Sequence, residues 1–226
     1  MYLHWSLILM IPGLLLGMYA QAKVSGAYKK YSNVAISGSY TGADVARRML
    51  GDNNLGHIRI EEVAGTMSDH YDPRSGVVRL SHDVYHGRTI AALGIAAHEI
   101  GHAIQDGEGY MALKIRNAVI PVTNFGSMLY FPLLLLGMLM SIPVLIKWGI
   151  ILFSVIVFFQ LITLPVEFDA SRRALVTLET DGFLNQDEMV GARKVLGAAA
   201  LTYVAAAVTA ILELLRLVIL FGGRNE

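Results

Sequence analysis

The chain has 226 residues, of which 54% are hydrophobic and only 16% are charged, and its mean hydropathy is +0.52. Soluble domains carry roughly 25% charged residues, so this composition is typical of a membrane protein. The formal net charge is zero, which gives no reason to expect nucleic acid as a partner. Cysteine is absent, which excludes disulfides, thiolate metal ligands and a thiol nucleophile, and leaves His, Asp and Glu to bind metal.

Four apolar stretches are each close to the roughly 20 residues that cross a bilayer. We expect spans at about residues 3–20, 126–146, 148–165 and 196–221. The first has no basic segment ahead of it, so it is interpreted as a retained N-terminal anchor rather than a signal peptide. Only Lys147 separates the second span from the third, which predicts a tight transmembrane hairpin. In the fourth span, Glu213 and Arg216 lie three residues apart and are expected to pair.

The distribution of Lys and Arg predicts the orientation of these spans. Residues 21–125 carry eleven of them, residues 166–195 carry four, and the tip of the hairpin carries one. By the positive-inside rule, both basic segments face the cytoplasm of the cell and the lipid bilayer encloses the spans. The expected organisation is therefore a single membrane domain over residues 1–226, with its catalytic segments on the cytoplasmic face.

The segment before the second span is polar enough to fold outside the bilayer. Alternating Ile58 and Ile60 indicate a strand at 57–63, and the turn-forming residues 72–76 predict a hairpin between 67–71 and 77–81. Helices are expected at 41–50, 88–105 and, at the membrane interface, 111–124. The predicted fold class is thus mainly α, a polytopic membrane protein with about four transmembrane helices and a small β-hairpin or sheet.

Residues 98–102 read His-Glu-Ile-Gly-His, inside the expected long helix. Four residues are about 400° of helical rotation, so His98 and His102 leave the same face one turn apart and can hold one zinc ion. Glu99 lies beside them, where it can take a proton from water that the metal activates. A charged trio among alanines and isoleucines needs a partner or a metal. The pattern predicts one Zn²⁺ per chain.

A catalytic zinc needs a third protein ligand, and three carboxylates are candidates. Glu108 lies six residues after His102, at the position where another peptidase class has its third histidine ligand. That class needs a glycine at position 105 to turn the chain, and this sequence has Gln105 there. Asp181 lies in a Thr-Asp-Gly triplet like that of site-2-type intramembrane proteases, among polar residues that favour a turn. Glu167 is favoured, because two spans separate it from His102 and an even number returns the chain to the same membrane face.

Three segments in order resemble the YugP-type neutral zinc metallopeptidases of bacterial membranes, over essentially the whole chain. In chain order they are Met-Ser-Asp-His-Tyr-Asp-Pro, which starts at residue 67, His-Glu-Ile-Gly-His, which starts at residue 98, and Glu-Phe-Asp-Ala-Ser-Arg-Arg-Ala, which starts at residue 167. The family in turn is similar to the gluzincins and to HtpX-like membrane peptidases. The resemblance implies a zinc metalloendopeptidase of the bacterial plasma membrane, which hydrolyses membrane or membrane-proximal proteins.

The resemblance also implies roles for single residues. Glu167 falls on the glutamate ligand position and Arg172 on the motif arginine, while Ser171 stands where relatives usually have an aspartate that orients a zinc-binding histidine. Asp169 is a candidate substitute for that aspartate. In the wider clan, a strand ahead of the zinc helix pairs with extended substrate, a position that 77–81 occupies here.

Oxyanion stabilisation requires a further hydrogen-bond donor, for which His70, Tyr71 and His82 are candidates. Two other functions stay open from the residues alone. One is a zinc-binding membrane protein without catalysis, which would have little need for Glu99 because Glu99 is no ligand. The other is a site-2-type intramembrane protease, which would use Asp181 as its third ligand.

Overall fold

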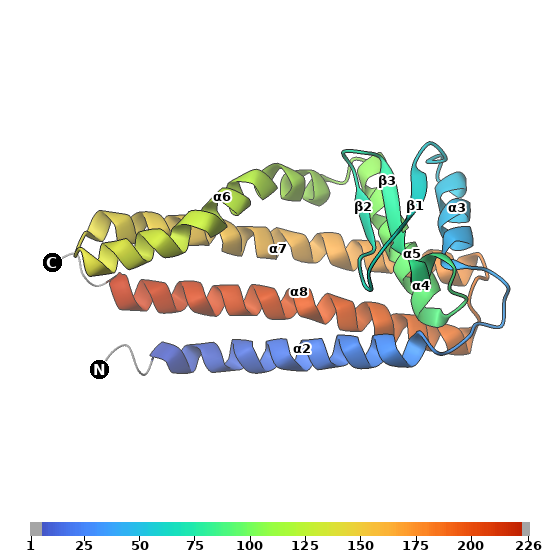
Figure 1. Ribbon diagram of the computed structural model, residues 1–226, viewed down its shortest axis with the longest axis horizontal. Helices are drawn as coiled ribbons and strands as arrows, with labels where there is room; N and C mark the ends of the chain where they lie inside the picture. The colour runs from blue at the N-terminus through green and yellow to red at the C-terminus, as the bar shows by residue number, and fades with distance from the viewer. Residues whose placement is uncertain (1–5, 223–226) are drawn as a thin grey trace.

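The computed structural model describes residues 6–222 as a bundle of long helices that carries a small sheet and short helices at one end (Figure 1). Its elements, in chain order, are η1 (Leu7–Leu9), α2 (Met10–Tyr31), α3 (Gly42–Asp52), β1 (Arg59–Val63), β2 (His70–Asp72), β3 (Val77–Ser81), α4 (His82–Tyr85), α5 (Ile90–Gly107), α6 (Met111–Leu139), α7 (Pro143–Thr180) and α8 (Gln186–Phe221). The chain is therefore mainly α, as the sequence predicted.

Four helical segments are long and apolar enough to cross a membrane: Leu7–Tyr31, α6, α7 and α8. Many of their large apolar side chains are exposed, among them Leu14 at 63% and Met128 at 74%, as expected where lipid rather than protein covers a helix. In α8, the Arg216 guanidinium donates to both carboxylate oxygens of Glu213, at 2.7 and 2.6 Å, so the expected pair forms.

The helix boundaries differ from the expected spans. Residues 3–5 of the first span lie outside the described residues, and α2 continues eleven residues past residue 20. The hairpin turns at residues 140–142, where Ser141 has a φ of +54°, so Lys147 lies inside α7 rather than at the tip. The expected interfacial helix 111–124 is the first half of α6, which bends along its length (Figure 1) and contains Pro121 and Pro132.

α7 is the element that joins the membrane to the site. It has 38 residues and continues through Pro165, where the third span was expected to end. At 1.5 Å per residue it is roughly 57 Å long, well beyond the ~30 Å hydrocarbon core. One end of α7 is therefore expected to extend out of the bilayer. The residues that follow Pro165 in α7 pack against α5.

The three strands form one sheet in the order β1-β3-β2. β2 and β3 pair antiparallel as the predicted hairpin, and β1 pairs parallel to β3 from Arg59↔Val77 to Val63↔Ser81. The expectation that 77–81 is free to pair with substrate is wrong, because both edges of β3 are already paired. The outer edges belong to β1, which packs against α3 and α4, and to β2, which packs against α5.

α5 begins where the Thr89 side chain accepts a hydrogen bond from the Ala92 backbone N–H. Its alanine-rich face packs into a core formed with α3, β3, α7 and α8. At Gly101, an added Cβ would lie 2.6 Å from the Ala170 carbonyl oxygen of α7. Glycine therefore permits the close crossing of the two helices at the residue directly before His102.

Candidate metal centre

His98 and His102 of α5 and Glu167 of α7 converge on one point. The Nε2 atoms of His98 and His102 lie 3.3 and 3.5 Å from Oε2 of Glu167. The three side chains are largely buried, with exposed fractions of 14%, 12% and 5%. The rings of the two histidines stand nearly perpendicular, with centroids 4.7 Å apart. The crossing at Gly101 thus brings together donors that are 65 residues apart in sequence.

The geometry of this cluster fits a zinc ion. Zn–N and Zn–O bonds are about 2.0–2.1 Å long, so donors at two corners of a tetrahedron lie about 3.4 Å apart. The two nitrogen–oxygen separations agree with that spacing. Oε2 of Glu167 is buried and accepts no hydrogen bond within residues 6–222. A buried carboxylate oxygen without a donor is costly, and a cation between it and the two rings removes that cost.

The charge around the cluster also favours a cation. Burial lowers the pKa of His102, but the adjacent Glu167 carboxylate and the negative charge of Glu99 outweigh burial and raise this pKa above its ordinary value. Glu99 itself is half-buried, and over the described part of the chain its carboxylate enters no hydrogen bond or ion pair. It is therefore available to accept a proton beside the cluster.

Each histidine is oriented by a polar neighbour on its other nitrogen. Nδ1 of His98 lies 3.1 Å from the Ser171 hydroxyl, and Nδ1 of His102 lies 3.1 Å from Oε1 of Gln105. The Gln105 amide in turn donates to Asp169 Oδ2 at 2.9 Å and to a backbone carbonyl of α7 at 2.8 Å. Because Oε1 of Gln105 can only accept, its contact favours the tautomer of His102 that carries the proton on Nδ1 and presents the Nε2 lone pair to a metal. The Ser171 hydroxyl can accept from Nδ1 of His98 in the same way.

These contacts refine the expectations for α7. Ser171, which stands at the usual aspartate position, contacts His98 itself. Asp169 reaches His102 only through Gln105, and it also accepts from Arg173 at 2.6 Å. The signal for Gln105 was present in the sequence, because a residue three positions after His102 lies on the same helix face.

Two further residues at the cluster were not singled out as site residues from the sequence. Arg116 of α6 donates to Oε1 of Glu167 at 3.2 Å, which anchors the oxygen that does not face the histidines. Tyr203 of α8 is largely buried and interacts with both Glu167 and Glu99. A single Arg at the start of an apolar helix and a Tyr among alanines are weak signals, since neither has a fixed spacing from the motif.

Other candidates from the sequence lie elsewhere. His70 contacts the Ser68 carbonyl, Tyr71 donates to Asp106 at 2.9 Å, and His82 contacts Glu62 at 2.6 Å. Burial and the Asp106 carboxylate raise the pKa of Tyr71, so its hydroxyl stays neutral. The hydrogen bond from this hydroxyl to Asp106 links β2 to α5. Arg172 is exposed and pairs with Asp169. Across residues 6–222, no interaction joins these four to the three converging donors.

The alternative third ligands are also separated from the cluster. Glu108 is the C-cap of α5 and pairs with Arg173 at 2.8 Å. Asp181 is the C-cap of α7, fourteen residues beyond Glu167, a separation of roughly 21 Å along a helix. Neither belongs to a group of potential metal ligands in the described part of the chain. The geometry favours Glu167.

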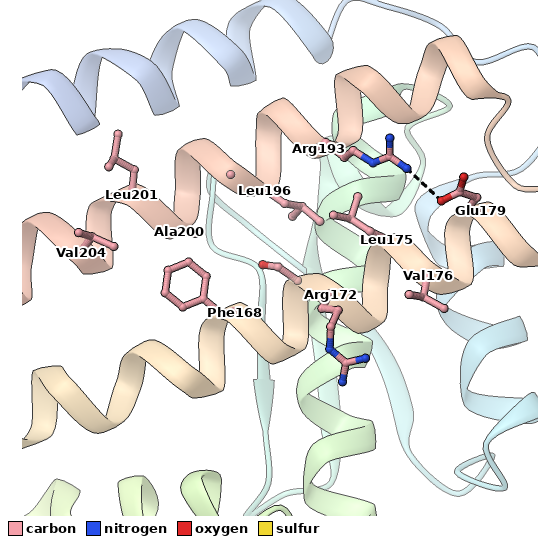
Figure 2. A pocket seen from close by; sticks show the side chains of 12 residues that line it. Phe168, Arg172, Leu175, Val176, Glu179, Arg193, Leu196, Ala200, Leu201 and Val204 are labelled. Atoms are coloured by element: carbon pink, nitrogen blue, oxygen red, sulfur yellow. Dashed lines mark hydrogen bonds and ion pairs between the residues drawn. The ribbon is translucent and has the colours of Figure 1, made fainter.

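A groove of about 510 Å³ flanks the cluster between α7 and α8. Phe168, Leu201 and Val204 line one end, and the ion pair between Arg193 and Glu179 lies at the other (Figure 2). Ser171 also lines it, so the groove adjoins the residue that contacts His98. The site therefore has an apolar flank that opens between two long helices.

Comparison with known proteins agrees with this chemistry. The family described as "Putative neutral zinc metallopeptidase" matches residues 6–222. The chain is 52% identical over 221 residues to a protein of Bacillus subtilis described as "Putative membrane protease YugP", and the match covers 97% of this chain and 98% of that protein. No solved structure is significantly similar to the chain.

Proposed function

Because the chain belongs to the neutral zinc metallopeptidase family, we propose that it is a zinc-dependent endopeptidase of gluzincin type in the bacterial plasma membrane. The proposal rests above all on the convergence of His98, His102 and Glu167 around a carboxylate oxygen without a donor, with Glu99 beside it. Its substrates are membrane or membrane-proximal proteins.

His98, His102 and Glu167 would hold the zinc ion, and the contacts of Ser171 and Gln105 would orient the two imidazoles. When bound, zinc polarises the scissile carbonyl and lowers the pKa of water at the open position. Arg116 keeps Glu167 in place through its second oxygen and offsets its charge. The donor set of two imidazoles and one carboxylate suits zinc and leaves room for water and substrate.

Glu99 acts as general base and then as general acid. Its carboxylate takes a proton from the attacking water and passes it to the amine that leaves. The proton is thus returned, and the products are a carboxylate and an amine. The Tyr203 hydroxyl, whose burial beside Glu99 and Glu167 places it near the cluster, is a candidate donor to the oxygen of the attacked carbonyl.

The sheet offers substrate an edge. Since β3 is paired on both sides, we assign substrate pairing to the outer edge of β2, which the hydrogen bond from Tyr71 to Asp106 holds against the zinc helix. The apolar groove beside Ser171 supports substrates with apolar segments. The positive-inside asymmetry supports an active site on the cytoplasmic face.

The function is tested with purified protein in detergent and an unfolded protein as substrate. Glu99→Gln is expected to keep its zinc and lose cleavage by roughly 10²–10⁴-fold, because only the proton transfer is removed. Glu167→Ala is expected to lose both. Asp181→Ala is the matched control on the same helix and should keep both.

Cleavage by Glu99→Gln at the wild-type rate would make the cluster a non-catalytic zinc site. Retention of zinc by Glu167→Ala together with loss by Asp181→Ala would instead support the site-2-type reading. Either result would overturn the proposed mechanism.

A further inference from the structure

A second cluster of two histidines and a glutamate lies on the opposite edge of the sheet from β2. Glu62 of β1 faces His82 of α4 and His86, the C-cap of α4. Its Oε1 lies 2.6 Å from Nδ1 of His82, and its Oε2 lies 3.1 Å from Nε2 of His86. One ligand atom of each residue lies within 4.8 Å of the others. The two rings are neighbours, with centroids 4.9 Å apart.

The local fold builds this arrangement. α4 begins directly after β3, and the four-residue spacing of His82 and His86 places both rings on the same side of this helical turn. β1 pairs parallel to β3 in the register Glu62↔Leu80, which brings Glu62 to the same end of the sheet. Within residues 6–222, Glu62 has ion pairs with these two histidines alone. The carboxylate is thus shared between two imidazoles that come from one element.

We propose that Glu62, His82 and His86 form a second binding site for a divalent transition metal such as zinc. The donor set is the one found at the buried cluster, two imidazoles and one carboxylate. The side chains are 43–71% exposed, which leaves room for the donors to open from 2.6 and 3.1 Å to the roughly 3.4 Å of a tetrahedral zinc site. Water completes the coordination.

Exposure sets the character of this second site. Its donors remain well solvated without metal, so binding is weaker and exchange is faster than at the buried cluster. A bound ion ties the outer strand β1 to α4, and α4 leads through Gly87 to Thr89, the N-cap of the zinc helix. Metal binding at this site therefore stabilises the position of the segment that precedes the catalytic motif.

Zinc stoichiometry in full-length protein tests the proposal independently of peptidase activity. All proteins carry Glu99→Gln to prevent self-cleavage and lack any histidine tag. After equilibration with a small excess of zinc, we expect two ions per chain in this background and one in H82A/H86A. One ion is also expected in H98A/H102A, and none in the quadruple variant.

H57A/H70A is the matched control, because it also removes two exposed histidines, and it should keep two ions. Glu62→Gln should weaken the second ion at least tenfold, and it keeps both histidines in case H82A/H86A fails to fold. Equal zinc content in the parent, H82A/H86A and Glu62→Gln would overturn the second site. Because H98A/H102A reports the other ion, that result would leave the proposed peptidase site intact.

Discussion

Two regions of this chain carry the same three donors in opposite surroundings. His98, His102 and Glu167 are buried at the crossing of two helices, whereas Glu62 and its two histidine partners are exposed at a sheet edge. In the buried cluster, polar neighbours hold both histidines and Arg116 holds the glutamate. In the exposed cluster, the carboxylate contacts both imidazoles directly.

The comparison separates the features that the two clusters share from those that support the proposed catalytic role of the buried one. Donor identity and helical spacing are shared, so neither explains catalysis. The buried cluster adds a polar neighbour for each imidazole and an adjacent apolar groove. It also adds Glu99, whose carboxylate has no hydrogen bond or ion pair among the described residues. These features come from the packing of α5, α7 and α8 rather than from the motif itself.

The largest contrast is expected when each glutamate is removed. Glu167→Ala should abolish cleavage to below a thousandth of the wild-type rate, because it removes both a ligand and the neutralising charge of the buried site. Glu62→Ala should leave the rate unchanged at saturating zinc. Initial rates on an unfolded protein substrate measure both, and a similar loss in the two variants would erase the distinction between the clusters.

The polar neighbours of the buried histidines provide the next test. Ser171→Ala should weaken zinc binding by roughly 10–100-fold, since the imidazole of His98 loses the partner that orients it. Ser171→Asp should retain tight binding. Ser154→Ala is the control, because Ser154 lies on the same helix and its hydroxyl donates to the Ile150 carbonyl of its own helix. Competition with a zinc chelator measures the affinities, and equal values for Ser171→Ala and the control would contradict an orienting role.

The crossing of α5 and α7 is tested by adding a methyl group. Gly101→Ala should destabilise the protein by about 1–3 kcal/mol, because its Cβ would overlap the Ala170 carbonyl. Gly94→Ala on the same buried helix meets no neighbour within 4 Å and should be tolerated. Thermal unfolding in detergent compares them. A Gly101→Ala protein as stable as the control would show that the helices do not cross so closely.

The smallest contrast concerns metal exchange. A chelator should remove the ion of the exposed cluster at least tenfold faster than that of the buried cluster, because water reaches its donors on all sides. Stopped-flow chelation of the Glu99→Gln protein should therefore show two phases. The fast phase should be absent in H82A/H86A, and a single phase in the parent protein would count against two clusters of unequal burial.

Local rules explain which parts of the fold were predictable. Helical periodicity placed His98 and His102 on one face, and the turn at residues 72–76 predicted the β2–β3 hairpin, which the structure confirms. The apolar runs predicted four spans, and residues 6–222 contain four helices of suitable length and composition. Topology favoured Glu167, because an even number of spans returns the chain to one side of the membrane.

Contacts between distant segments were not predictable. The parallel pairing of β1 with β3 joins residues eighteen apart and has no local signature, so β3 was wrongly expected to be an open edge. Pro165 indicated the end of a span, yet α7 continues through it, because membrane-spanning helices tolerate an internal proline. The roles of Gln105 and Arg116 depend on the crossing of α5, α6 and α7, which no single segment encodes.

The central claim, a buried zinc ion held by His98, His102 and Glu167, is most directly tested by X-ray absorption at the zinc edge. The protein should carry H82A/H86A, so that the buried ion alone contributes. The spectrum should show two imidazoles at about 2.0–2.1 Å with oxygen ligands completing the shell, and Glu167→Ala should lose the ion. A spectrum with fewer than two imidazoles, or one unchanged by Glu167→Ala, would contradict the proposed centre.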